Sequence, residues 1–166
     1  AEAVGLDGPT HRAFLSAFYT GRTSGSFARG EGFQVNPTTG DQRVSGTFAS
    51  LAGVEAALAD GDPDALSRAI ERIVLGHALI MGWDGVPLLY MGDEIGLRND
   101  HGYLADPDRA ADSRWLHRPR MDWAAAERRH DQATVEGRIF RGLRGLVDAR
   151  RETPQLAASA PLTTID

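Results

Sequence analysis

The sequence predicts part of an α/β protein that, taken alone, is mostly helix and loop. Residues 63–82 and 134–151 have the apolar spacing of amphipathic helices. Between them, residues 86–91 form a short apolar run flanked by glycines, which is typical of a strand buried on both faces. This order of helix, strand, long loop and helix is one repeat of an α/β architecture. Because a lone strand cannot satisfy its own backbone groups, we expect its neighbouring strands outside this chain.

The first 50 residues are predicted to be an ordered, loop-rich region that contains a short helix or two. Thr10 is a suitable N-cap and Gly21 a suitable stop for that helix. Its apolar face would hold Phe14, Leu15 and Phe18. The stretch "NPTTGD", residues 36–41, has the residue chemistry of a turn. Five aromatic residues between positions 14 and 33 are too many for a plain linker.

Two further helices are predicted before the apolar run. The stretch "GTFASLAGVEAALADG" predicts one that ends at Gly61. In the next, Asp62 caps the start and Pro63 occupies the first helical position. Its apolar stripe comprises Leu66, Ala69, Ile70, Ile73, Val74, His77, Ile80 and Met81. We interpret His77 as a packed core histidine rather than a metal ligand, since no second ligand is spaced for it.

A long polar segment, residues 93–131, follows the apolar run. Segments of this length are usually functional or disordered. We expect this segment to be ordered, because it contains the aromatic residues Tyr103, Trp115 and Trp123. The last helix begins near Thr134 and has the stripe Val135, Ile139, Leu143, Leu146 and Val147, and Pro154 prevents its continuation.

Composition limits the function classes. The chain of 166 residues has a formal net charge of −5, which argues against a nucleic-acid partner. It has no cysteine, so disulfides and thiolate metal sites are excluded, and no apolar run approaches the length of a membrane span. We expect no cofactor, no metal and no membrane partner, and we favour a cytoplasmic location.

The adjacent carboxylates Asp93 and Glu94 are poor candidates for catalysis. In extended backbone they would point to opposite faces, whereas glycoside chemistry needs two carboxyl groups facing each other. We therefore expect them to bind loop amides and arginines. A metal site can be assembled from these two with Asp100 and His101, but it lacks a recognised spacing.

Three arginines are better candidates for ligand binding. Arg12, Arg43 and Arg114 each lie beside aromatic or glycine-rich segments. A guanidinium offers five fixed donors, which suit vicinal hydroxyls and carboxylates alike, and an aromatic face beside it can seat a sugar ring. Most surface arginines are only solvated charges, and that alternative stays open for each. No order of Ser, His and Asp suggests a catalytic triad.

Three stretches resemble the amylosucrases of the α-amylase superfamily, which is glycoside hydrolase family thirteen. The stretch "GVPLLYMGDEIGLRND" resembles strand eight of the superfamily's (β/α)8 (TIM) barrel. The stretches "GSFARGEGFQVNPTTGDQRVSGT" and "DSRWLHRPR" are more specific to amylosucrases and related sucrose hydrolases. The resemblance covers roughly residues 3–154. It implies a barrel fragment (helix seven, strand eight and helix eight) preceded by a loop subdomain.

The resemblance also implies an activity and a division of the chain. Amylosucrases cleave sucrose with retention, release fructose and transfer glucose to an α-1,4-glucan acceptor. Their nucleophile, acid and third Asp all precede the part that matches here, so no catalytic residue is expected in this chain. Residues 1–60 would be the loop subdomain inserted after strand seven, residues 61–153 the end of the barrel, and residues 154–166 the start of a C-terminal β domain.

By position in the motifs, four residues are implied to bind substrate. Arg12 and Phe14, in "HRAF", and Arg43, in "GDQRVSG", match acceptor-side residues. Arg114, in "DSRW", matches an arginine that pairs with an upstream Asp to close the glucose pocket, so we expect it to be buried. The implied partners are sucrose, an α-glucan acceptor and the remainder of the barrel. Two alternatives stay open, a sucrose hydrolase and a non-catalytic glucan-binding module.

Overall fold

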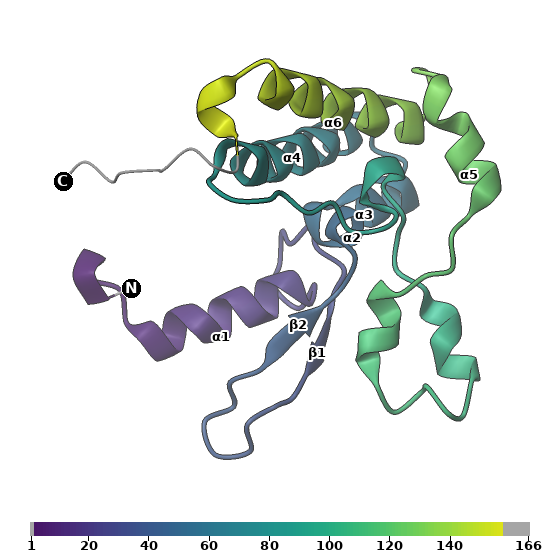
Figure 1. Ribbon diagram of the computed structural model, residues 1–166. Coiled ribbons are helices and arrows are strands. Elements are labelled where there is room, and N and C mark those ends of the chain that lie inside the picture. The colour runs from purple at the N-terminus through teal and green to yellow at the C-terminus, as the bar shows by residue number, and fades with distance from the viewer. Residues whose placement is uncertain (1, 158–166) are drawn as a thin grey trace. The chain divides into compact units, whose positions relative to one another are not determined.

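The computed structural model describes residues 2–157 and shows a mostly helical chain with one small two-stranded sheet (Figure 1). Most of residues 154–166, where we expect a β domain to start, lies outside the described residues. The chain divides into two compact units. The first contains residues up to Ala69 together with Leu97–Arg120, and the second contains Ile70–Gly96 and the residues from Met121 onward.

The first unit is built from short elements. Its helices and strands are η1 (Glu2–Val4), α1 (Gly8–Tyr19), β1 (Glu31–Phe33), β2 (Arg43–Ser45), α2 (Phe48–Ala52), α3 (Val54–Asp60), η3 (His101–Ala105) and η4 (Ser113–His117). The boundary between the units falls within α4 (Pro63–Gly82). The other elements of the second unit are η2 (Asp93–Ile95), α5 (Trp123–Glu127), η5 (Arg128–His130), α6 (Val135–Arg151) and η6 (Pro154–Leu156).

Helix α1 begins earlier than the sequence predicts. Asp7 is its N-cap, and the Asp7 Oδ2 atom accepts a hydrogen bond of 2.9 Å from the Thr10 amide. The prediction of Thr10 as the cap is therefore wrong, because an aspartate three residues earlier satisfies the same orphan amide. The predicted stop is confirmed: the helix ends at Tyr19, and Gly21 has a φ of 73°.

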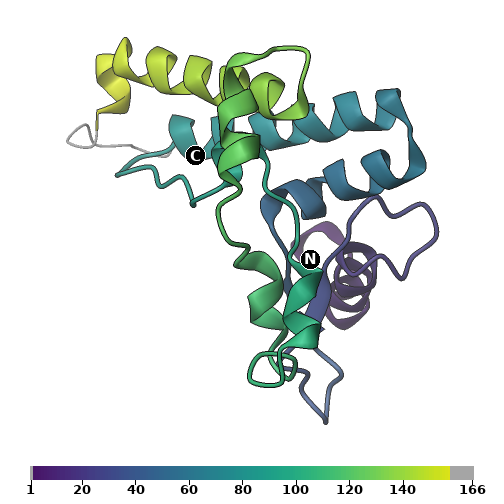
Figure 2. The same ribbon diagram turned by 90° about the vertical axis from the view of Figure 1, so that its right-hand side faces the viewer.

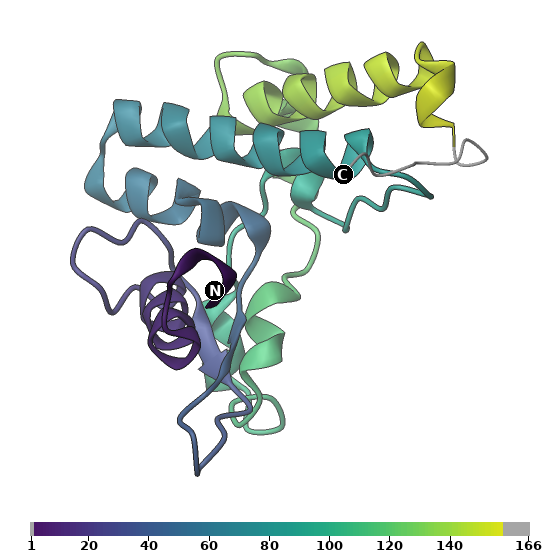
Figure 3. The ribbon, with the colours of Figure 1, turned by 90° about the vertical axis from the view of Figure 1, so that its left-hand side faces the viewer.

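A β-hairpin that the sequence did not predict follows α1. Strands β1 and β2 pair antiparallel, with Phe33 opposite Arg43. The predicted turn at residues 36–41 is confirmed and closes the hairpin, where the Asn36 side chain accepts hydrogen bonds from the Thr38 and Thr39 amides. Figure 3 shows α1 beside the hairpin, and the Gly30 amide donates to the Tyr19 carbonyl at 2.9 Å. Strands of three residues are too short to show an alternating apolar pattern.

The stretch predicted as one helix before Gly61 is two helices. Gly53 separates α2 from α3 and has a φ of 108°, a left-handed value that an L side chain rarely adopts and that interrupts the helix. The predicted end at Gly61 is confirmed, with a φ of 65°.

Helices α4 and α6 match their predicted starts. The Asp62 side chain accepts hydrogen bonds of 2.9 Å from the Asp64 and Ala65 amides, and Thr134 caps α6 by accepting from the Gly137 amide at 3.0 Å. Buried residues of the predicted α4 stripe are Ala69, Ile70, Ile73, His77 and Met81, whereas Ile80 is exposed. On α6, Ile139 and Leu143 are buried. As predicted, α6 ends before Pro154.

The predicted strand at residues 86–91 is absent. Residues 86–90 have no regular secondary structure, and within residues 2–157 no strand pairs with them. Val86, Leu88 and Tyr90 are 85%, 77% and 50% exposed. The physical reason is that a strand needs a neighbouring strand to pair with. The hairpin β1–β2 is the only sheet among residues 2–157, and it does not pair with this segment.

The predicted order of residues 93–131 is confirmed, because most of this segment lies in short helices. Tyr103 of η3 and Leu116 of η4 are buried, whereas Trp123 is 73% exposed and does not contribute to a core. Figure 2 shows η3 and η4 beside the hairpin. No helix among the described residues is long and apolar enough to cross a membrane.

Candidate functional site

The first unit contains a pocket of about 540 Å³. One wall is residues 31–35, which comprise β1 and the two residues after it, and the other is formed by Tyr103 and residues 110–114. Its lining therefore combines two aromatic residues, Phe33 and Tyr103, with the charged residues Glu31, Asp112 and Arg114. Aromatic rings beside fixed polar groups are the composition expected of a small-molecule site.

Contacts between the hairpin and η4 hold the two walls together. The Ser45 hydroxyl of β2 lies 3.0 Å from the Ser113 carbonyl and 2.7 Å from His117 Nδ1. Because the hydroxyl has one proton and a carbonyl can only accept, donation to Ser113 leaves His117 Nδ1 to donate to the hydroxyl. The Ser113 hydroxyl in turn donates to the Gly32 carbonyl at 3.3 Å. These bonds hold Ser113 against the hairpin and so position the main chain of the next residue, Arg114.

Arg114 is paired within the chain rather than buried. Its Nε donates to Asp112 Oδ1 and its Nη2 to Asp112 Oδ2, each at 2.8 Å, which is a bidentate pair. The side chain is 48% exposed in this chain. Burial of Arg114 is expected in the intact enzyme, against an Asp outside this chain, and stays a prediction. The hydrogen bond from Arg114 lowers the pKa of the Asp112 carboxyl to about 2. The contribution of this pair to stability is therefore present above the ordinary pKa of 3.8 and is lost as the pH falls through about 2.

The pairing predicts a measurable titration. In Arg114→Gln, the pKa of the Asp112 carboxyl is expected to rise from about 2 towards its ordinary value of 3.8, because the charged donor is lost. Carbon-detected NMR of the carboxyl group against pH measures this shift. The control Arg12→Gln also removes an exposed arginine and should leave Asp112 unchanged. An unaltered Asp112 titration in Arg114→Gln would mean that the bidentate pair does not exist in solution.

Tyr103 and Glu31 join the two walls of the pocket. The Tyr103 hydroxyl donates to Glu31 Oε2 across 72 residues of sequence. Burial, and next the hydrogen bond to Glu31, raise the pKa of Tyr103 to about 12, so the phenol stays protonated and remains a donor. Sequence analysis used Tyr103 only as a sign that residues 93–131 are ordered, and no motif indicated Glu31.

Gln34 is a second pocket residue that sequence reasoning missed. Its φ is 53°, and it is the only non-glycine residue with positive φ among the described residues. Such a conformation costs about 1 kcal/mol or more for a residue with a side chain, and it recurs at ligand sites. No sequence signal indicates it, since glutamine has no preference for this region.

The other three predicted site residues lie outside the pocket lining, on α1 and β2. Arg12 pairs with Asp41 at 3.3 Å, and both side chains are exposed. Phe14 is 50% exposed, with its ring centroid 5.9 Å from that of Phe18. Arg43 is exposed on β2. The structure therefore brings Arg12 to the end of the hairpin and leaves Phe14 and Arg43 accessible, but only Arg114 lines the pocket.

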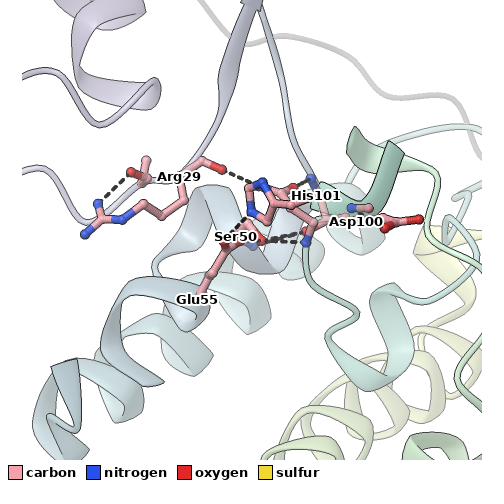
Figure 4. Close-up of polar contacts among 9 residues, drawn as sticks. Arg29, Ser50, Glu55, Asp100 and His101 are labelled. Carbon is pink, nitrogen blue, oxygen red and sulfur yellow. Dashed lines mark hydrogen bonds and ion pairs between the residues drawn. The ribbon is translucent and has the colours of Figure 1, made fainter. Parts of the chain in front are cut away.

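A cluster of the buried Ser50, the partly buried Glu55 and the exposed His101 lies elsewhere in the first unit (Figure 4). Ser50 Oγ donates to Glu55 Oε2 at 2.5 Å, and Glu55 Oε1 lies 2.7 Å from His101 Nε2. Ser50 is fully buried and contacts the carboxylate, not the histidine, so it lacks the base that would activate a nucleophile. The cluster is structural, since the Ser50 hydroxyl also accepts from the Asn99 amide at 3.0 Å and the Asn99 side chain binds the Arg29 carbonyl.

In the second unit, His77 is a buried core histidine, as predicted. Its Nδ1 lies 2.9 Å from the Ile73 carbonyl and its Nε2 lies 3.5 Å from Asp93 Oδ2. Burial alone would lower the pKa of His77, but the hydrogen bonds to Asp93 and Ile73 outweigh it and raise the pKa. Glu94 accepts from the Gly92 amide at 2.8 Å, which confirms that it binds a loop amide. Among residues 2–157, no group of three or more His, Asp or Glu side chains could hold a metal ion.

A comparison of the sequence with models of known protein families finds no match.

Proposed function

We propose that this chain is part of a sucrose-cleaving, retaining glucosyltransferase of the amylosucrase type, within the α-amylase superfamily. In this proposal the nucleophile and the acid/base belong to a part of the protein outside this chain, so the chain alone is inactive. It contributes the end of a barrel and one wall of the sugar site. The observation that carries the proposal is the pocket in which Arg114, the arginine of the "DSRW" motif, lies beside Tyr103 and β1.

The chemistry of this pocket suits a sugar. Phe33 supplies aromatic surface, and Glu31, Asp112 and Arg114 supply acceptors and donors for hydroxyl groups. Arg114 already binds Asp112 through Nε and Nη2, which fixes the plane of its guanidinium. A guanidinium held by one carboxylate keeps further N–H groups that can donate to a ligand. Such preorganised donors support binding without the cost of ordering a flexible side chain.

The exposed apolar segment supports the proposal that a barrel is shared with another part of the protein. Val86 and Leu88 are 85% and 77% exposed, although the stretch "GVPLLY" has the composition of a strand buried on both faces. Soluble proteins rarely expose several large apolar side chains from one short segment to water. Pairing of residues 86–91 with neighbouring strands would bury them and satisfy their backbone groups.

The acceptor side of the proposed site is α1 with the hairpin. Phe14 is half exposed and offers a ring face, and Arg43 is exposed on β2. Arg12 is fixed by its ion pair with Asp41. Retention of these three residues favours transfer to a glucan, because a bound acceptor competes with water for the glucosyl group. A sucrose hydrolase would share the same motifs and is the alternative if the glucosyl group goes to water.

A non-catalytic glucan-binding module is the alternative from another class. The pocket favours this alternative because both of its walls lie within the first unit of this chain. The coding sequence upstream of Ala1 separates the two classes. By the resemblance described above, the enzyme requires an open reading frame that encodes, before Ala1, the rest of a barrel with the nucleophile, the acid and the third Asp. A start codon or a stop codon adjoining Ala1 would leave the module.

A further inference from the structure

The charges in the pocket beside β1 do not cancel. Its lining includes two carboxylates, those of Glu31 and Asp112, and one guanidinium, that of Arg114. Asp112 and Arg114 form a bidentate pair, so their charges offset each other. Glu31 is left as the net charge of the lining, and a pocket wall of one sign repels ligands of the same sign.

Tyr103 fixes the Glu31 carboxylate without neutralising it. The phenol donates one hydrogen bond to Oε2, and Tyr103 itself is 4% exposed, so it is a rigid donor. A carboxylate has about four lone-pair positions, so this bond leaves most of the acceptor capacity of Glu31 for other donors. Sugar hydroxyls can supply those donors, whereas a second carboxylate or a phosphate cannot.

We propose that Glu31, positioned by Tyr103, makes this pocket selective for neutral sugars over anionic sugars of the same size. The inference rests on the proposed function in taking a sugar as the ligand, and it deepens that function by naming the residue that sets the ligand charge. The selectivity is electrostatic, so added salt weakens it.

The experiment compares two ligands that share the pyranose ring and differ at C6, where methyl α-glucoside has a hydroxymethyl group and methyl α-glucuronide has a carboxylate. Each is titrated into the 166-residue chain, and amide shifts of residues 31–35 and 110–114 give the dissociation constants. We expect the wild type to bind the glucoside roughly three- to tenfold more tightly at low salt, from Coulomb repulsion near a protein surface. The preference should shrink in 0.5 M NaCl.

Three variants distinguish the effect of the Glu31 charge from other effects of substitution. Glu31→Gln keeps an oxygen that can accept from Tyr103, and it should abolish the preference. Tyr103→Phe keeps the carboxylate charge but removes the hydrogen bond that positions it, so it should weaken the preference without abolishing it. Glu71→Gln makes the same change of charge at an exposed position of α4 and should behave as the wild type.

A preference that survives in Glu31→Gln, a wild type that binds both ligands equally or neither, or a salt-independent preference would each overturn the proposal. The salt dependence of the wild type provides this test even if Glu31→Gln does not fold. Failure of the proposed function is seen separately, as absence of sucrose turnover by the protein encoded by the complete reading frame. A chain that prefers the glucoside without belonging to a sucrose-cleaving protein would retain the inference about Glu31 alone.

Discussion

Replacing Gly137 with alanine is expected to lower the free energy of unfolding of the second unit by about 3 kcal/mol, since overpacking against backbone cannot relax easily. A Cβ atom at this position of α6 would lie 1.9 Å from the Asp131 carbonyl oxygen and 2.5 Å from its carbon. The contacting atoms are main chain, so no flexible side chain can move away. The substitution would also disturb the Thr134 cap, whose hydroxyl accepts from the Gly137 amide.

Gly145→Ala is the matched control on the same helix. No heavy atom lies within 4 Å of its added Cβ, so alanine should stabilise α6 by about 0.5–1 kcal/mol through helix propensity. Urea denaturation followed by circular dichroism measures both variants. Equal effects of the two substitutions, or a Gly137→Ala variant as stable as the wild type, would show that the turn at Asp131 does not pack against the start of α6.

Replacing Arg150 with methionine is the second large expected effect. The Arg150 guanidinium of α6 donates to three carbonyls at and beyond the end of α4, those of Met81, Trp83 and Gly85. Methionine keeps much of the apolar stem and removes all the donors. We expect a loss of about 2–4 kcal/mol, because hydrogen bonds from a charged donor are worth more than neutral ones and the carbonyls lose their partner together.

Arg151→Met provides the comparison one residue along the helix. The Arg151 side chain is 75% exposed and lies 4.0 Å from Asp148, so its loss should cost less than about 0.5 kcal/mol. The same denaturation experiment applies. A cost for Arg150→Met no greater than for Arg151→Met would mean that water replaces the guanidinium and that Arg150 does not join α6 to the end of α4.

Local signals made the long helices predictable from sequence. The starts of α4 and α6 follow from Asp62 and Thr134, whose side chains cap nearby amides within the same few residues. The buried stripe on α4 follows from apolar periodicity. The break at Gly53 did not follow, because a helix tolerates an isolated glycine, so the residue type alone does not indicate the left-handed conformation that Gly53 adopts.

Features that depend on distant partners could not be read from the sequence. The three-residue strands β1 and β2 exist because they pair with each other, and three residues give no periodic pattern. The apolar composition of residues 86–91 predicts a buried strand, but the described residues contain no strand to pair with it, and Val86 and Leu88 are exposed. The sequence of a segment indicates which secondary structure it can form, but a strand forms only where another strand is present to pair with it.

In the candidate site, too, some features follow from local sequence and others depend on residues far apart in the chain. Arg114 was found through a motif, and its bidentate partner Asp112 lies two residues away. Glu31 and Tyr103 meet across 72 residues, so only the fold reveals the pair. The expected burial of Arg114 depended on a partner outside this chain, whereas within the chain the nearby Asp112 satisfies its charge.

Fructose release from sucrose tests the central claim most directly. The chain of 166 residues would be assayed alone and as part of the protein encoded by its complete reading frame. The proposed function predicts no release above background by the chain alone, because the nucleophile and the acid are elsewhere, and steady turnover by the complete protein. Removal of such groups costs several orders of magnitude in rate, so the contrast should be large. Fructose release by the chain alone, or none by the complete protein, would contradict the assignment.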